Sequence, residues 1–379
     1  MLLNDLPDDC LWLIFDYFFE LEELIKLSQV CSKWSSLISI RFERVKYLFP
    51  KKPEDNIDYS KIWMTDPVNT LKHHNLPELL PNLRIVTVVD EVENYELKPR
   101  HFRKVINNNP KIKGVIGLRN KCKLNLRHIE MIAMNHMVNF KKVFRPDQLK
   151  QIQFEGFHVH YLPEYVEYFP SLKRLHICLY GGSRYNGPNL SKLKILEAYV
   201  SGWDEACDKF NVIDYCPSLE SACICGSTDD QSIDISIKNY NLRDLVIDIP
   251  WIDNMNWSSI RKLLTKFPNL NHLAIRRSGE VEDCHVEELV KLLPQIKLLD
   301  FRESVGVTVK SADFLSKFCL KSNRSIKIYY DCEKEPDSWP KYDTPRESIV
   351  YGFDFMKHCF YKSFSRLPLL IDDQINLLE

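Results

Sequence analysis

The stretch FPNLNHLAI, residues 267–275, is the clearest of six similar segments that decide the fold of this chain. Each segment carries aliphatic residues with the spacing L-x-x-L-x-L, and most begin with an apolar residue followed by proline. The other five are LPNLRIVTV (80–88), FPSLKRLHI (169–177), CPSLESACI (216–224), NLRDLVIDI (241–249) and LPQIKLLDF (293–301). Internal repetition of this kind is typical of stacked units that bury their apolar faces against one another.

The first aliphatic residue of each beat serves as its anchor. The anchors are Leu83, Ile112, Leu149, Leu172, Leu193, Leu219, Leu242, Leu270 and Ile296, with a tenth expected at Ile326. Helical phrases such as YLPEYVEYFP (161–170) and HVEELVKLLP (285–294) lie between them. The spacing resembles that of the leucine-rich repeat, whose units run roughly 20–29 residues. We therefore expect an α/β solenoid with parallel strands on the concave side and helices on the convex side; an irregular α/β domain is the alternative.

A small polar residue recurs eight positions after several anchors. The residues at this offset are Asn120, Ser201, Ser227, Ser278 and Ser304. Serine can bond to neighbouring backbone groups where the chain turns after a strand, as the repeat family's usual Asn or Cys would.

The residues between the aliphatic positions of each strand should face the concave side, because side chains alternate along a strand. Neighbouring units then form ladders, among them Tyr199, Cys225, Asp248, Arg276 and Arg302. The candidate substrate-binding residues are His176, Tyr199, Asp248, His272, Arg276, Arg277, Asp300 and Arg302. Two interpretations stay open. Asp248 and Arg276 pair across adjacent strands, or Arg276, Arg277 and Arg302 meet an acidic or phosphorylated segment of a partner protein.

The N-terminus carries three short apolar stripes with helical spacing. They are Leu11, Ile14, Phe15 and Phe18; Leu21, Leu24 and Leu27; and Cys31, Trp34 and Ile38. Pro7 suits a first helical turn, and Asp8 and Asp9 suit the positive end of the helix dipole. Three such helices in some forty residues are too small to bury all of this surface among themselves. They either cap the next domain or hold apolar surface for another protein.

The order of residue types in this stretch resembles an F-box over residues 2–45. The matching run is Leu6-Pro7-x-x-x-Leu11, Ile14-Phe15, Leu24, Leu27-Ser28, Val30-Cys31 and Trp34. The resemblance implies docking on the Skp adaptor of an SCF-type ubiquitin ligase, and through it on the cullin/RING core. Carried over by position, the adaptor-binding residues are Leu6, Pro7, Leu11, Ile14, Leu24, Leu27, Val30, Cys31 and Trp34. The chain would then be a non-catalytic substrate receptor that captures an unknown target protein for ubiquitination; a non-degradative F-box/LRR scaffold or regulatory protein is the alternative.

The expected domain order is an F-box at 1–48, a connection with a short helix at 49–80, the solenoid at 81–332 and a C-terminal tail at 333–379. The tail is rich in aromatic residues, including Phe355, Phe360, Tyr361 and Phe364, which is unlike a disordered extension. Since an open solenoid end needs a cap, we expect the tail to close the last repeat. In the alternative, PLLIDDQINLLE (368–379) runs onto the concave face or reaches a partner.

Composition narrows the remaining function classes. The net charge is −1, and the 14 Lys and Arg residues in the basic block 98–150 come with no nucleic-acid recognition motif, so nucleic acid is not an expected partner. We interpret that block as a solvated face or a contact for an acidic protein surface. No segment has the pattern of a signal peptide or membrane span, and the 12 cysteines are expected to be thiols in the cytoplasm or nucleus. We expect no metal or cofactor, since the cysteines lack paired zinc spacing and enzymatic motifs such as HExxH or a Walker loop are missing.

Overall fold

The computed structural model describes residues 3–52, 61–88, 99–118, 125–134, 139–180, 184–201, 210–228, 232–250, 255–331 and 355–372. The chain divides into two compact units, residues 1–149 and 150–379, and each is treated by itself below.

Three helices open the first unit: α1 (Asp8–Asp16), α2 (Leu21–Ser28) and α3 (Ser32–Glu43). They follow the three apolar stripes of the sequence. Helix α1 begins directly after Pro7, whose missing N–H is not needed there. The short 3₁₀ turn η1 (Leu3–Asp5) precedes it.

The rest of the first unit is a parallel sheet with helices. Its strands pair in the order β2-β1-β3-β4-β5. They are β1 (Tyr47–Phe49), β2 (Lys61–Trp63), β3 (Ile85–Thr87), β4 (Gly114–Ile116) and β5 (Met131–Met134). The helices are α4 (Pro67–His73), α5 (Leu76–Leu79), η2 (Pro99–Phe102), α6 (Arg103–Asn108) and α7 (Phe140–Val143).

Two strands of this sheet were not expected. Strand β2 lies in the segment assigned to a connection. Strand β5 reveals a unit inside the longest anchor spacing, with the fully buried Ile129 in the anchor position two residues before the strand. The segment 125–134 carries no proline-led beat, which is why the repeat pattern passed over it.

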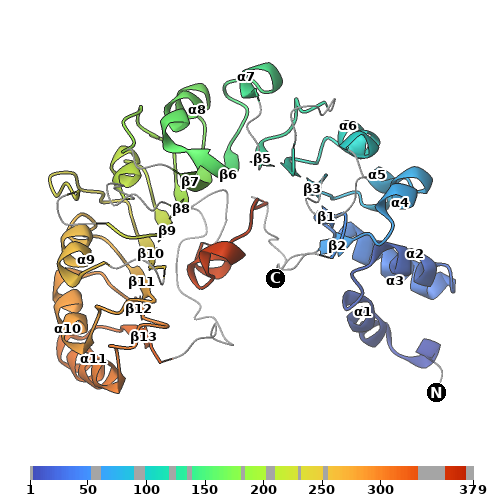
Figure 1. Cartoon of the computed structure of the whole chain (residues 1–379). Coiled ribbons are helices and arrows are strands. Elements are labelled where there is room, and N and C mark those ends of the chain that lie inside the picture. The colour runs from blue at the N-terminus through green and yellow to red at the C-terminus, as the bar shows by residue number, and fades with distance from the viewer. Residues whose placement is uncertain are drawn as a thin grey trace. The chain divides into compact units, whose positions relative to one another are not determined.

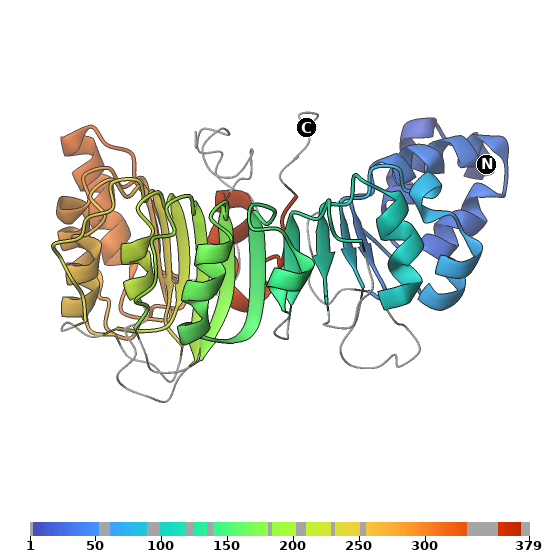
Figure 2. The ribbon, with the colours of Figure 1, turned by 90° about the horizontal axis from the view of Figure 1, so that it is seen from above.

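The second unit is a parallel sheet whose strands pair in chain order from β6 to β13. They are β6 (Gln151–His158), β7 (Arg174–Tyr180), β8 (Ile195–Ser201), β9 (Ser221–Cys225), β10 (Asp244–Asp248), β11 (His272–Arg276), β12 (Leu298–Asp300) and β13 (Lys327–Tyr329). Short helices connect them: η3 (Val159–Tyr161), α8 (Leu162–Tyr168), η4 (Asn211–Tyr215), α9 (Trp257–Leu264), α10 (Asp283–Leu292) and α11 (Val309–Ser322). These helices cover one face of the sheet (Figures 1 and 2).

The strand register follows the anchors. Each strand from β6 to β12 begins two residues after its anchor, from Leu149 before Gln151 to Ile296 before Leu298. The exception is the tenth anchor: Leu298 pairs with Lys327, so the expected position of Ile326 is wrong by one residue. The turn serines perform the expected task, because Ser304 accepts a hydrogen bond from the backbone N–H of Ser278 (3.1 Å) and donates to the carbonyl of Ile275 (3.1 Å).

We call the sheet face opposite helices α8–α11 the inner face. The C-terminal segment, defined as residues 355–372, lies on it and forms the π-helical turn η5 (Met356–Phe360) and the 3₁₀ turn η6 (Phe364–Arg366) (Figure 1). The described part of the tail therefore crosses the inner face instead of closing the last repeat as expected. Residues 333–354 lie outside the described part of the chain.

Candidate docking surfaces

The N-terminal helices have a closed apolar core of their own. Leu11 and Leu24 are fully buried, and Trp34 packs edge-on against Phe15 with ring centroids 5.3 Å apart. Leu11, Leu24 and Trp34, which were assigned to the motif's core and docking face, thus lie in the core. Their contribution to docking is to hold the helices in place.

Polar contacts fix these helices to the strands and helices that follow. The carboxylate of Glu22 accepts hydrogen bonds from the backbone N–H groups of Thr65 (3.0 Å) and Asp66 (3.2 Å) and from the hydroxyl of Thr70 (2.5 Å). These bonds lower the pKa of Glu22 against the opposing effect of burial. The three helices and the start of the sheet are therefore one rigid body within the first unit.

Other apolar side chains of the same helices face outward. Among the expected adaptor-binding residues, Pro7 and Val30 are exposed, with Val30 at 57%, while Leu6, Ile14, Leu27 and Cys31 are half-buried. Two exposed side chains were not among the expected residues: Leu13 at 62% and Tyr17 at 80%. Cys10, Leu13, Ile14 and Tyr17 form a second stripe at i, i+3, i+4 and i+7 on α1, and this spacing could have revealed them.

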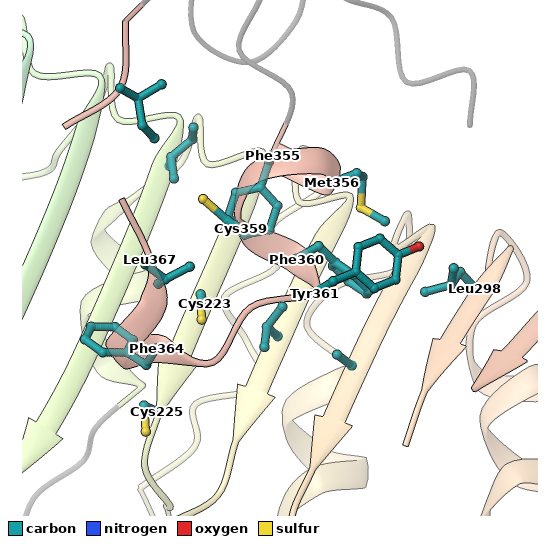
Figure 3. Close-up of a cluster of buried hydrophobic side chains, with 14 residues drawn as sticks. Cys223, Cys225, Leu298, Phe355, Met356, Cys359, Phe360, Tyr361, Phe364 and Leu367 are labelled. Atoms are coloured by element: carbon teal, nitrogen blue, oxygen red, sulfur yellow. The ribbon is translucent and has the colours of Figure 1, made fainter. Parts of the chain in front are cut away.

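The inner face of the second unit carries the predicted ladders. The register aligns Tyr199, Cys225, Asp248 and Arg276 in one row. A second row holds His176, Glu197, Cys223, Val246, Ala274 and Asp300. These ladders are covered by the C-terminal segment. Its side chains Phe355, Cys359, Phe360, Phe364 and Leu367 pack with Cys223, Cys225 and Leu298 in one buried cluster (Figure 3).

Glu197 forms the first charged cluster beneath the segment. Its carboxylate is fully buried and pairs with the guanidinium of Arg174; it also contacts Nδ1 of His176 at 3.0 Å and accepts from Sγ of Cys359 at 3.1 Å. Burial alone would raise the pKa of Glu197, but Arg174, His176 and Cys359 together lower it to about 2. The same guanidinium donates to the carbonyls of Pro368 (2.6 Å) and Leu369 (3.0 Å) of the segment.

Asp300 forms the second charged cluster. It accepts from both Arg276 (2.7 and 3.1 Å) and Arg302 (2.9 to 3.1 Å), and these two charges lower its pKa against the effect of burial. Arg276 also donates to the carbonyls of Phe360 and, at 2.8 Å, Lys362. Arg302 donates to the carbonyl of Tyr361 at 2.8 Å.

The expected pairing of Asp248 with Arg276 is wrong. Asp248 binds Arg277 instead (2.7 Å), while Arg276 turns to Asp300. Arg276 and Arg302 are 4% exposed, so these two arginines are not presented to an acidic or phosphorylated partner as the second interpretation requires. The expected residues are nevertheless brought together: His176 and Tyr199 contact the ring of Phe364, at centroid distances of 4.9 and 5.8 Å, and His272 bonds Asp244 at 2.6 Å.

Sequence reasoning missed three groups that bind the segment. Arg174 and Gln151 occupy the position two residues after their anchors, in the row of Asp244 and His272, so the ladder argument could have included them. Gln151 exchanges two hydrogen bonds with the backbone of Ile371, donating at 2.8 Å and accepting at 3.2 Å. The third, Cys359, has no local sequence signal.

The basic block lies partly outside the described residues. Its described cations are mostly exposed, as for Arg103, Lys104, Lys142 and Arg145. Across the described ranges, no group of three or more His, Cys, Asp or Glu residues is placed to hold a metal ion. No described helix is both long and apolar enough to span a membrane.

Comparison with known proteins agrees with the geometry of the N-terminal helices. No curated protein matches the chain. A family model does: residues 3–42, which contain helices α1 and α2 and almost all of α3, match the F-box-like family, so this part of the chain is an F-box-like domain.

Proposed function

We propose that this chain is the substrate-recognition subunit of an SCF-type ubiquitin ligase. Its F-box-like domain would bind a Skp adaptor, and its second unit would capture a target protein. The observation that carries the proposal is the outward apolar stripe of α1, with Leu13 and Tyr17 62% and 80% exposed although the domain's own core is closed. Contiguous exposed apolar surface of this kind marks a protein interaction site.

We further propose that the repeated strand–helix units are divergent leucine-rich repeats. Support comes from the parallel strands paired in chain order, the anchors two residues before each strand from β6 to β12, and the serines that bond the turning backbone. Such a repeat domain offers an extended surface for a macromolecular partner.

The proposed mechanism needs no chemistry from this chain. Tethering a target beside a ubiquitin-carrying enzyme raises the effective concentration of the target's lysines, and orientation does the rest. The chain's contribution would be two binding surfaces held in one polypeptide.

Capture of recombinant Skp adaptor tests the proposal. Val30→Asp and Leu13→Asp place a charge on the outward surface and should weaken capture by about tenfold or more, as expected for a desolvated contact at an interface. Val305→Asp is the matched control, because Val305 is 87% exposed in the second unit. Failure of the unmodified chain to bind the adaptor would refute the proposal, and full binding by Val30→Asp and Leu13→Asp would show that another surface docks.

A further inference from the structure

The C-terminal segment is held to the inner face mainly through its backbone. Arg174, Arg276 and Arg302 donate to five of its carbonyls, and Gln151 bonds both backbone groups of Ile371. Backbone groups are common to all peptides. This part of the contact therefore selects a path of the chain and not a particular sequence.

The donors that hold the segment are fixed by the sheet itself. Arg174 is paired with Glu197, and Arg276 and Arg302 share Asp300, and all of these residues lie on strands of the sheet or directly after one. If the segment left, each guanidinium would keep its carboxylate and gain water. No buried charge would lose its partner, which is the change that makes disruption of an ion pair costly. The inner face is thus organised for a peptide before the peptide binds.

Sequence selection rests on apolar side chains. Phe360, Phe364, Leu367 and Ile371 are all buried, at spacings of four, three and four residues. They pack with the rows that contain Cys223, Val246 and Ala274 (Figure 3).

The charges of this face balance. The ladder and candidate residues include four arginines and four carboxylates: Arg174, Arg276, Arg277 and Arg302 against Glu197, Asp244, Asp248 and Asp300. A matching partner is therefore neutral and apolar where it lies on the face.

We propose that the inner face is a peptide-binding site that the C-terminal segment occupies as an intramolecular ligand. A partner segment with aromatic or aliphatic residues at the spacing of Phe360, Phe364, Leu367 and Ile371 replaces it. This inference rests on the proposed function, since it identifies the target-binding surface and the kind of target segment that fits. Covalent attachment favours the intramolecular segment through its effective concentration, so capture requires a partner that outcompetes it.

The test uses the full chain with a protease site inserted between residues 340 and 341. After cleavage, a fluorescent peptide of residues 355–372 is added and its binding is followed by anisotropy. We expect the peptide to enter the cleaved chain and to bind the uncleaved chain at least about tenfold more weakly, because there the tethered segment competes.

Peptide and protein variants define the contact. A Phe360→Ala/Phe364→Ala peptide should bind on the order of a hundredfold more weakly, since two aromatic anchors are lost. A Ser365→Ala peptide should bind normally because Ser365 is exposed. In the protein, Arg276→Met should weaken binding by about tenfold. Arg324→Met is its control, since Arg324 donates to the carbonyls of Val290, Leu293 and Ile296 away from the segment.

The outcomes separate the two proposals. If the labelled peptide does not enter the cleaved chain at any temperature below its melting point, the segment is a permanent part of the fold and the inference is overturned. Equal binding of the Phe360→Ala/Phe364→Ala peptide would also overturn it, and this arm does not depend on whether a protein variant folds. If the peptide exchanges but the adaptor is not captured, the proposed function fails while the peptide site stands.

Discussion

Replacing Glu197 by glutamine tests how the charged cluster supports the second unit. The substitution removes the charge that faces Arg174, whose side chain is 1% exposed, while shape and hydrogen-bonding capacity are nearly kept. The pKa of Glu197 is lowered from 4.5 to about 2, which corresponds to about 3 kcal/mol of stabilisation of the charged form. A buried guanidinium left without its partner costs a similar amount, about 3–5 kcal/mol. We therefore expect Glu197→Gln to lower the free energy of unfolding by about 3 kcal/mol at pH 7.

The pH dependence makes this prediction specific. Because the folded-state pKa of Glu197 lies below its unfolded value, its contribution is present above pH 4.5 and is lost as the pH falls toward 2. The difference in unfolding free energy between parent and variant should shrink over that window. Urea unfolding followed by circular dichroism at a series of pH values measures it.

A constant difference from pH 7 to pH 3 would refute this reasoning, because it would show that the loss comes from packing and not from charge. Asp313→Asn is the control for general charge effects, since Asp313 is exposed on α11. Its unfolding curve should follow the parent at every pH.

Three further predictions concern packing and reactivity. Phe360→Ala should lower the free energy of unfolding by about 3–5 kcal/mol, whereas Leu320→Ala, at an 84% exposed position, should change it by less than about 0.5 kcal/mol; equal losses in urea melts would contradict this. Trp34→Ala should speed hydrogen exchange throughout helices α1–α3, because the ring is part of their core; unchanged exchange would place it outside. Timed alkylation with mass spectrometry should find the exposed Cys10 modified first and Cys359 last, because burial raises the pKa of the Cys359 thiol and little thiolate forms; similar rates would mean that the C-terminal segment opens readily.

The helices and ladders were accessible from the sequence for a local reason. The period of 3.6 residues placed Leu11 and Phe15 on the buried side of α1, and the period of two placed His176 and Glu197 on the same sheet face. The same rule, applied to α1 once more, would have exposed the outward stripe of Leu13 and Tyr17.

Individual ion pairs were not accessible in this way. Arg277 has a positive φ of 58°, so the strand alternation ends there and its side chain reaches Asp248. Arg276 is left to bind Asp300 on the neighbouring strand. Alternation predicts which face a residue lies on, but a single left-handed residue after the strand changes which charge it meets.

The sequence by itself determined the F-box-like helices, the repeated strand–helix units and the rows of residues on the inner face, because each depends on spacing within a few dozen residues. Only the tertiary structure decided what covers those rows. The bonds of Arg276 to the backbone of Phe360 and Lys362 join residues more than eighty positions apart. Carbonyl groups carry no sequence signature, so a contact between a side chain and a distant backbone becomes visible only once the chain has folded.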